Sequence, residues 1–289
     1  MSRWYRKQGN SAWIMGVLNC TPDSFSDGGK NFEADAAIAH GLKMRDMGAS
    51  IIDVGGESTR PGAAKVDLEE ELRRTIPVVR ALAAEGCTVS IDTMKAEVMR
   101  QAIEAGALMV NDVSALSFDS DALRVVADAG VDVCLMHMQG TPETMQLKPG
   151  YSDVVSEVGE FLERRIEASL AAGIAESALL IDPGIGFGKR LEDNLALLSC
   201  IPELKRRLQR PLLLGVSRKS FLGLITGSEV DERELETAAA NAIGVFQGAD
   251  LLRVHEVGPQ HRAAQVAAVL GDVAGNSCQN NSCQNKTKT

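Results

Sequence analysis

Eight short apolar segments recur along this chain, and their regular spacing restricts the fold more than any other feature. Successive segments start about 34 residues apart on average, which fits the roughly 30 or more residues that a strand and its following helix require. The segments are apolar throughout, as buried parallel strands are. The expected strands cover residues 12–18, 50–54, 88–91, 108–110, 131–136, 178–181, 211–216 and 249–254.

Amphipathic helical patterns separate the apolar segments. In one of them Leu68, Leu72, Ile76, Val79 and Leu82 form a single apolar stripe, because they are spaced by three or four residues. Glycine follows several of these patterns, which is typical of the residue after a helix C-terminus. The other expected helices cover residues 34–47, 95–105, 121–129, 154–172, 191–208, 234–247 and 259–270.

Strict alternation of strand and helix predicts an α/β fold with a parallel sheet. Eight such units favour a (β/α)8 TIM barrel, and the missing dinucleotide-binding fingerprint weakens the alternative of an open doubly wound sheet. No linker-like segment divides the chain, so residues 1–274 are expected to form a single domain. Residues 275–289 are polar and contain the pentapeptide Asn-Ser-Cys-Gln-Asn twice, which predicts a disordered tail.

Composition argues against several classes of function. The net charge is −9, whereas nucleic-acid-binding domains present a basic face, so no nucleic-acid partner is expected. No apolar run approaches the ~18 residues of a membrane-spanning helix, and residues 1–10 are basic without an apolar core behind them, so no membrane association is expected. None of the six cysteines forms a Cys-x-x-Cys pair, which argues against a zinc site or a disulfide framework. Together these features predict a cytoplasmic protein.

A polar residue follows each of the expected strands. Because the C-terminal strand ends of a (β/α)8 barrel form one rim, these side chains are expected to surround an active site. An Asp or Asn in this position can instead cap the next helix; we expect that role for Asp112 and leave it open for Asp53. The polar strand ends are Asn19, Asp53, Asp92, Asn111–Asp112, His137, Asp182, Ser217–Lys219 and the pair Arg253 and His255.

Basic residues gather after the last two strands. Arg253 and His255 occupy alternate positions, so their side chains point the same way, and Lys219 follows the preceding strand. Barrels of this type commonly bind phosphate near strands seven and eight, and Arg and Lys are suited to phosphate. Lys219, Arg253 and His255 are therefore expected to form an anion site, whereas Arg218 alone is explained equally well as a solvated basic turn.

Asp92, Asn111 and Asp182 end the third, fourth and sixth expected strands. Carboxylates of this kind can bind a metal ion, but no His accompanies them and their spacing matches no metal signature. The other interpretation is a heterocycle rich in N–H donors. Two carboxylates and an amide suit the edge of an amino-oxo-pyrimidine ring, because each buried donor needs an acceptor.

Residues 179–189 carry three alternating glycines before Lys189 and superficially resemble a phosphate-binding loop. Pro183 and Arg190 stand where the Walker-type loop requires Gly and then Ser or Thr, so that interpretation fails. Replacement of Lys189 by Ala is accordingly expected to have little effect on ligand binding.

Two loops, residues 19–29 and 55–62, are rich in Gly, Ser and Pro. Such loops are typical of mobile lids over a rigid scaffold, although ordinary surface turns have a similar composition. As part of a lid, Arg60 is expected to close on an anion.

These strand ends and loops combine into several longer motifs. Residues 16–29 read Gly-Val-Leu-Asn-Cys-Thr-Pro-Asp-Ser-Phe-Ser-Asp-Gly-Gly. Residues 52–62 read Ile-Asp-Val-Gly-Gly-Glu-Ser-Thr-Arg-Pro-Gly, and residues 180–189 read Leu-Ile-Asp-Pro-Gly-Ile-Gly-Phe-Gly-Lys. With them the chain resembles the dihydropteroate synthase family of bacterial folate biosynthesis, from Gly16 to about Leu270. Further matching segments are Asn111–Asp112, Met136–Gly140, Gly215–Ser220 and Arg253–His255.

The resemblance implies a transferase that joins (7,8-dihydropterin-6-yl)methyl diphosphate to 4-aminobenzoate and releases diphosphate and 7,8-dihydropteroate. It also implies Mg²⁺ as cofactor, with Asn19 near the metal, and a homodimer. The Ala-rich stretches 237–240 and 263–269 permit close helix packing in such a dimer. Residues 57–62 keep the pattern of drug-sensitive family members, so sulfonamides are expected to compete with 4-aminobenzoate.

The same resemblance implies a role for each site residue. The pterin is bound by Asp92, Asn111, Met136, Asp182 and Lys219, with Gly215 also in the substrate-binding set. The diphosphate is bound by Asn19, Thr59, Arg60, Arg253 and His255. The 4-aminobenzoate lies near Thr59, Pro61, Phe187, Ser217 and Lys219. The catalytic residues are Asn19, Arg60, Lys219, Arg253 and His255.

Three alternatives remain open. A barrel of the methyltetrahydrofolate methyltransferase type would share the pterin-binding residues without needing the anion site. A catalytically silent pterin-binding paralogue would be expected to lack Asn19, Thr59 and Arg60, all of which are present. A sugar-phosphate aldolase barrel would need a Schiff-base lysine. Lys219 is the only candidate, and its serine-flanked polar setting predicts that its pKa is not lowered.

Overall fold

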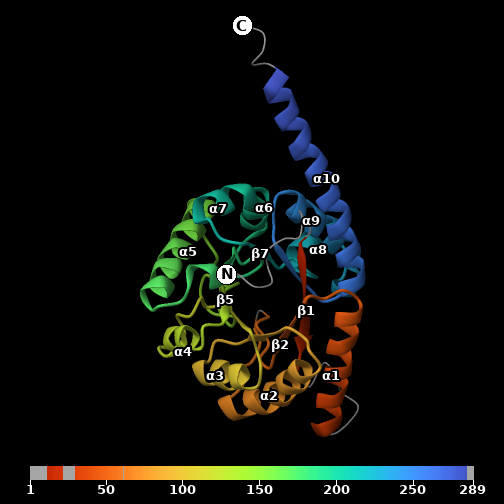
Figure 1. The fold of residues 1–289 in the computed structure, drawn as a ribbon. Helices are drawn as coiled ribbons and strands as arrows, with labels where there is room; N and C mark the ends of the chain where they lie inside the picture. The colour runs from red at the N-terminus through yellow and green to blue at the C-terminus, as the bar shows by residue number, and fades with distance from the viewer. Residues whose placement is uncertain (1–11, 22–29, 61, 285–289) are drawn as a thin grey trace.

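The structure, a computed structural model, describes residues 12–21, 30–60 and 62–284 of the 289-residue chain. Within these residues eight parallel strands form a barrel and the helices surround it (Figure 1). The expected (β/α)8 TIM barrel is confirmed. The strands are β1 (Trp13–Asn19), β2 (Ile51–Gly55), β3 (Val89–Asp92), β4 (Met109–Asp112), β5 (Asp132–Met136), β6 (Leu179–Asp182), β7 (Leu213–Leu214) and β8 (Leu251–Val254).

The barrel closes between β6 and β7. Neighbouring strands pair in the order β6-β5-β4-β3-β2-β1-β8-β7. A bridge between Ile181 and Leu212 joins the two ends, and the amide of Ile181 donates to the carbonyl of Pro211 at 3.0 Å. β7 is shorter than the expected 211–216 at both ends. At its start Pro211 has no N–H, and the amide of Leu212 donates to Asp250 Oδ2 at 2.9 Å.

The helices agree with the expected ranges except in the second half of the chain. The expected helix 191–208 is divided at Cys200, because Pro202 cannot continue the hydrogen bonding of α6. A further helix, α8, follows Lys219 and is not expected from the sequence. The α-helices of the described residues are α1 (Lys30–Asp46), α2 (Leu68–Ala84), α3 (Ala96–Glu104), α4 (Ala122–Ala129), α5 (Val154–Ala171), α6 (Leu191–Ser199), α7 (Ile201–Leu208), α8 (Ser220–Thr226), α9 (Glu234–Phe246) and α10 (Val257–Gln284).

The last helix, α10, continues well past the expected residue 270 and extends away from the barrel (Figure 1). No proline interrupts residues 260–284, so nothing in the sequence blocks the continuation. The helix therefore includes part of the segment 275–289 for which disorder is expected, while residues 285–289 lie outside the described residues. Disorder of this tail stays a prediction.

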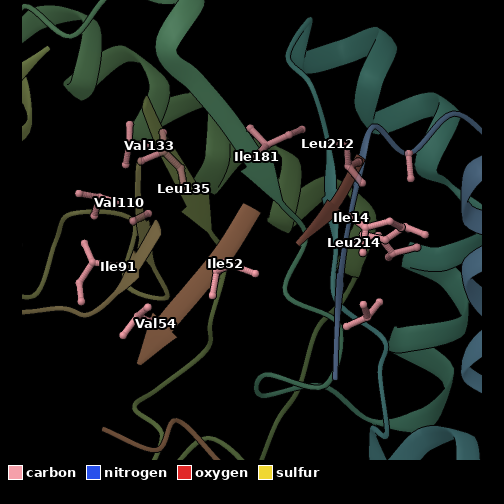
Figure 2. Close-up of a cluster of buried hydrophobic side chains, with 14 of the residues drawn as sticks. Ile14, Ile52, Val54, Ile91, Val110, Val133, Leu135, Ile181, Leu212 and Leu214 are labelled. Carbon is pink, nitrogen blue, oxygen red and sulfur yellow. The ribbon is translucent and has the colours of Figure 1, made fainter. Parts of the chain in front are cut away.

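Alternate residues of each strand face opposite sides of the sheet. The outward-facing set packs in the main hydrophobic core, together with apolar side chains of the surrounding helices. Figure 2 shows this set strand by strand, and its labelled members are Ile14, Ile52, Val54, Ile91, Val110, Val133, Leu135, Ile181, Leu212 and Leu214.

The inward-facing residues form two successive layers. The lower layer is apolar except for Ser90 of β3 and at most 1% exposed; its apolar members are Met15, Ile51, Met109, Cys134, Leu180, Leu213 and Leu251. Residues two positions further along each strand point the same way and form the next layer toward the C-terminal ends. That upper layer consists of Val17, Asp53, Asp92, Asn111, Met136, Asp182, Gly215 and Arg253. The predicted polar strand ends therefore lie on a packed apolar floor.

Two findings concern membrane spans and cysteines. Among the described residues no helix is long and apolar enough to cross a membrane. The cysteines described, Cys20, Cys87, Cys134 and Cys200, are free thiols.

Candidate active site

A cavity of about 50 Å³ lies above the upper layer of the barrel, at the C-terminal strand ends. All but two of its lining residues are predicted site residues. Val17 and Val113 are not predicted, because an apolar residue at a strand end gives no chemical signal in the sequence. The lining residues are Val17, Asn111, Val113, Met136, Asp182, Phe187, Gly215, Ser217, Lys219, Arg253 and His255.

Arg253 joins two carboxylates beside this cavity. Its Nε donates to Asp53 Oδ2 at 2.7 Å and its Nη2 donates to Asp92 Oδ2 at 2.6 Å. Asp53 is fully buried and also accepts a hydrogen bond from the amide Nδ2 of Asn111 at 2.9 Å. Asp53 therefore positions Arg253 and Asn111 and does not cap a helix. Its signal in the sequence is the same as that of Asp92, a carboxylate within an apolar strand.

The two carboxylates predicted to bind the pterin, Asp92 and Asp182, are buried, and burial disfavours their ionised forms. Burial raises the pKa of Asp92 to about 7, although the Arg253 guanidinium acts in the opposite direction. Burial also raises the pKa of Asp182, against the opposing effects of Lys219 and of the Gly184 amide, which donates to Asp182 Oδ1 at 2.7 Å. Among the described residues Asp92 Oδ1 is buried without a hydrogen-bond partner. A ligand with N–H donors would satisfy it and stabilise its ionised form.

Lys219 lines the cavity together with Asp182 and Phe187. Its Nζ donates to the carbonyl of Ile185 and stands 4.5 Å from the centroid of the Phe187 ring. Burial of the ammonium lowers the pKa of Lys219 to about 8, although the Asp182 carboxylate raises it. The expectation that the Lys219 pKa is not lowered is therefore wrong. The neighbouring serines do not keep the Lys219 pKa at its ordinary value, because the loop after β6 covers the ammonium and excludes water.

His255 contributes a hydrogen-bonding group to the cavity and no positive charge. Its Nδ1 lies 2.9 Å from Ser217 Oγ, and its backbone amide donates to the same oxygen at 3.2 Å. Burial lowers the pKa of His255 to about 3, and the nearby guanidinium of Arg253 acts in the same direction. The cations of the predicted anion site that line the cavity are thus Lys219 and Arg253.

Two strand-end residues have structural roles. Arg218 does not line the cavity and is paired with Glu234 at 2.7 Å and Glu256 at 3.1 Å, so the expected solvated basic turn is an ion-paired one. Asp112 accepts hydrogen bonds from Ser114 and, at 2.9 Å, from the amide of Leu116. It therefore stabilises the loop after β4, which precedes α4, and not the first turn of a helix.

The loop after β6 holds Phe187 at the cavity. Gly184 has a φ of 70°, and a Cβ there would lie 1.9 Å from the carbonyl oxygen of His137. Lys189, only 3% exposed, extends its ammonium back to His137 Nδ1 at 3.0 Å and to the carbonyls of Phe187 at 3.0 Å and His137 at 3.3 Å. The alternating glycines thus permit a tight turn against the end of β5, and Lys189 fixes that turn.

The predicted lid residues lie outside the cavity lining. Asn19 is half-buried at the end of β1, Thr59 is half-buried in the loop after β2, and Arg60 is exposed. The amide of Gly62 in this loop donates to the carbonyl of Pro142 at 3.2 Å. Pro61 and residues 22–29 lie outside the described residues, so the structure does not test their expected roles.

The expected Mg²⁺ ion can be compared with the donor atoms present. The described residues contain no group of three His, Cys, Asp or Glu side chains that could hold a metal ion. Mg²⁺ characteristically takes few protein oxygens and completes its coordination with water and substrate phosphates. The amide oxygen of Asn19 at the β1 end fits that pattern, as part of a site completed by a diphosphate.

Comparison with known proteins identifies the family. A family model described as "Pterin binding enzyme" matches residues 15–255. The dihydropteroate synthase of Escherichia coli (strain K12) is 48% identical over 245 residues, which are 84% of this chain and 86% of that protein. The chain belongs to the dihydropteroate synthase family. The methyltransferase-type, silent-paralogue and aldolase alternatives are not favoured by this result.

Solved structures of dihydropteroate synthases have the same fold. The enzyme of Xanthomonas albilineans, solved with 4-aminobenzoic acid, is 48% identical with a TM-score of 0.85, over 90% of this chain and 93% of that one. The Yersinia pestis enzyme, solved with a sulfonamide drug complex, is 44% identical with a TM-score of 0.85, over 90% of this chain and 94% of that one. Both cover the barrel almost completely.

Proposed function

We propose that this protein condenses (7,8-dihydropterin-6-yl)methyl diphosphate with 4-aminobenzoate to give 7,8-dihydropteroate and diphosphate. The observation that carries the proposal is the cavity at the strand ends of a barrel of this family. There the acceptors Asn111 and Asp182 meet the cations Lys219 and Arg253, with Asp92 directly behind Arg253.

The pterin is the ligand that the buried acceptors fit. Asp92 has a carboxylate oxygen without a partner among the described residues, and the Asn111 amide, held by Asp53, keeps its carbonyl oxygen as an acceptor. Met136 and Val113 supply apolar surface for the ring faces. Two carboxylates and an amide oxygen match the N–H donors of the ring, so each buried polar atom gains a partner.

Substrate binding requires the two long cationic side chains to move. Ligand cavities usually measure roughly 300–1,000 Å³, whereas this cavity measures about 50 Å³. Arg253 is drawn onto Asp92, and Lys219 is drawn onto the carbonyl of Ile185. When the pterin N–H groups donate to Asp92, they replace Arg253 Nη2, which then becomes available to the diphosphate. Arg253 Nε still donates to Asp53.

The reaction breaks the bond between the methylene carbon and the diphosphate oxygen, and the electron pair leaves with the diphosphate. The amine nitrogen of 4-aminobenzoate forms the new bond to the methylene carbon and loses a proton. Arg253 and Arg60 stabilise the charge of the leaving diphosphate, and neutral His255 offers a hydrogen bond. Asn19 and the diphosphate would hold Mg²⁺, which would supply further positive charge there.

The second substrate lies against Phe187, with Lys219 and Ser217 beside it and Thr59 and Pro61 on the loop after β2. In support of this placement, the Phe187 ring and the Lys219 ammonium are in direct contact, so an aromatic face and a positive charge are offered together. A sulfonamide presents a similar aromatic ring and acidic group, and we propose that it competes for the same place.

We also propose a homodimer located in the cytoplasm. Large apolar side chains are exposed on α9 and α10, among them Leu235 (79%), Ile243 (51%), Val266 (63%) and Val269 (64%). Such a face is typical of an interface between subunits. The free thiols of the described cysteines suit a reducing compartment.

The deciding experiment is a product assay with the purified full-length protein, Mg²⁺ and both substrates, read by chromatography. We expect 7,8-dihydropteroate from the wild type, and a rate roughly 100-fold lower from Lys219→Ala, because a buried cation at the reacting centre is lost. A sulfonamide should raise the apparent KM for 4-aminobenzoate. Lys148→Ala, on an exposed loop, is the control and should behave as wild type. Failure of the wild type to form product from both substrates would refute the proposed function.

A further inference from the structure

Lys95 joins both ends of the segment that carries Thr59 and Arg60. It follows β3 as the N-cap residue of α3. Its Nζ donates to the carboxylate of Glu57 at the start of the segment and to the carbonyl of Val66 at its end, the latter at 2.9 Å. A single ammonium from a third element therefore closes the base of the loop after β2.

The Lys95 ammonium is itself held in place from below. It also donates to the carboxylate of Glu71 in α2, whose side chain is 1% exposed. The other oxygen of Glu71 accepts a hydrogen bond from Thr93 Oγ1 at 2.6 Å. Lys95 thus pairs with two carboxylates at once, and without its positive charge Glu57 and Glu71 would repel each other more strongly across the base of the loop.

Between its two ends the segment is joined to the loop after β5 by a hydrogen bond from the Gly62 amide to the Pro142 carbonyl at 3.2 Å. A cavity of about 180 Å³ separates Ser58, Ala63 and Val66 from apolar side chains of the neighbouring loops, including Met94 and Met138. Residues that line a cavity lack packing partners on that side. The position of the segment therefore depends on that one central hydrogen bond and on its fixed ends, which are the Lys95 contacts and a hydrogen bond from Arg74 to the Gly56 carbonyl at 2.9 Å.

We propose that Lys95 is a positioning residue for 4-aminobenzoate, and that it acts by fixing the ends of residues 58–65 so that Thr59 and Arg60 are presented to the second substrate. The inference rests on the proposed function, which assigns that substrate to this segment. Lys95 has no hydrogen bond to the predicted pterin residues Asp92, Asn111 or Asp182. Its loss should therefore affect the two substrates unequally.

The kinetic test compares full-length wild type with Lys95→Met. We expect the KM for 4-aminobenzoate to rise about tenfold, while the Kd of 6-hydroxymethyl-7,8-dihydropterin, measured by calorimetry, changes less than about twofold. Arg100→Met is the matched control, because Arg100 lies on the same helix between Glu97 and Glu104, at 2.8 and 2.5 Å, but is exposed and remote from the loop. An equal rise in both constants, or no rise in either, would overturn the proposal.

A second measurement does not depend on catalysis. Lys65 is exposed within the segment, so trypsin should cut after it about tenfold faster in Lys95→Met than in the wild type or Arg100→Met, because the loop opens more often. If the wild type makes no product, the proposed function is refuted, yet the cleavage rate still tests whether Lys95 fixes the ends of the segment. Should Lys95→Met not fold, Glu57→Gln keeps the pair of Lys95 and Glu71 and should change both readouts in the same direction. Unchanged cleavage in these variants contradicts the inference.

Discussion

Asp92 is a carboxyl group buried in the site and paired with Arg253, although burial disfavours its ionised form. The carboxyl group is buried, its neighbour Asp53 is also acidic, and Arg253 is the cation that pairs with both of them. Burial is the largest influence on the Asp92 pKa, and it favours the protonated form. The unfolded chain has no such constraint, so the group links folding to pH.

We expect Asp92→Asn to change the pH dependence of stability. The Asp92 pKa is about 7 in the folded protein and 3.8 ordinarily, so the folded state binds more protons between these values. The free energy of unfolding of the wild type should therefore fall as pH rises through this range, by at most about 4 kcal/mol from this group. The variant cannot ionise and should lack that part of the slope. Urea unfolding at pH 4.5 and pH 8, as approximate bounds of the range, measures it.

The control for this prediction is Asp128→Asn, a change at a side chain that is 72% exposed. It should keep the wild-type slope. Equal slopes in Asp92→Asn and the wild type would show that Asp92 is ionised in both folded and unfolded states.

At the scale of elements, the loop between β6 and α6 depends on Lys189. The expectation that Lys189→Ala has little effect on pterin binding stays a prediction. The surroundings of Lys189 indicate a structural role, because the side chain is buried and donates hydrogen bonds to the carbonyls of His137 and Phe187. Burial lowers the pKa of Lys189 to about 7, despite the Asp182 carboxylate, which raises it. The lysine of this glycine-rich motif therefore stabilises the turn and does not bind phosphate.

We expect Lys189→Met to lower the free energy of unfolding by roughly 1–3 kcal/mol, because the side chain fits in length while two buried carbonyls lose their donor. Chemical unfolding at pH 8 measures the difference. Lys148→Met, in an exposed loop, should leave the stability unchanged. If the Lys189 variant is as stable as the wild type, the lysine does not fix the turn.

At the scale of the whole molecule, one side of the barrel differs from the rest. Leu235, Ile243 and Phe246 are exposed on α9, and Val266 and Val269 are exposed on the neighbouring helix α10. On each helix these residues are spaced so that they form an apolar stripe. The catalytic face at the strand ends is a separate surface, so two copies can associate through the helices while both cavities stay accessible.

We expect the double variant Ile243→Glu and Val269→Glu to be monomeric, because each added carboxylate would be buried unpaired in the interface. Size-exclusion chromatography with light scattering should give a dimer for the wild type. Leu147→Glu, on a loop residue that is 75% exposed, should remain dimeric. A monomeric wild type would contradict the proposed homodimer.

The sequence by itself determines the barrel and the membership of its polar rim. The alternation of apolar strands and amphipathic helices is a local pattern, and side chains two positions apart on a strand must share a face. Asp92, Asn111, Asp182 and Arg253 are therefore identifiable as rim residues without coordinates. The division of α6 from α7 is harder to predict, since a proline can begin a helix as well as end one.

Only the tertiary structure decides which of these side chains become partners. Arg253 binds Asp53 and Asp92, which are 200 and 161 residues away in the chain. The loop after β6 shields the Lys219 ammonium from water, and Lys95 pairs with both Glu57 and Glu71. Hydrogen bonds and pKa values depend on distances of a few ångströms and on the exclusion of water, and neither quantity is contained in a local pattern of apolar and polar residues.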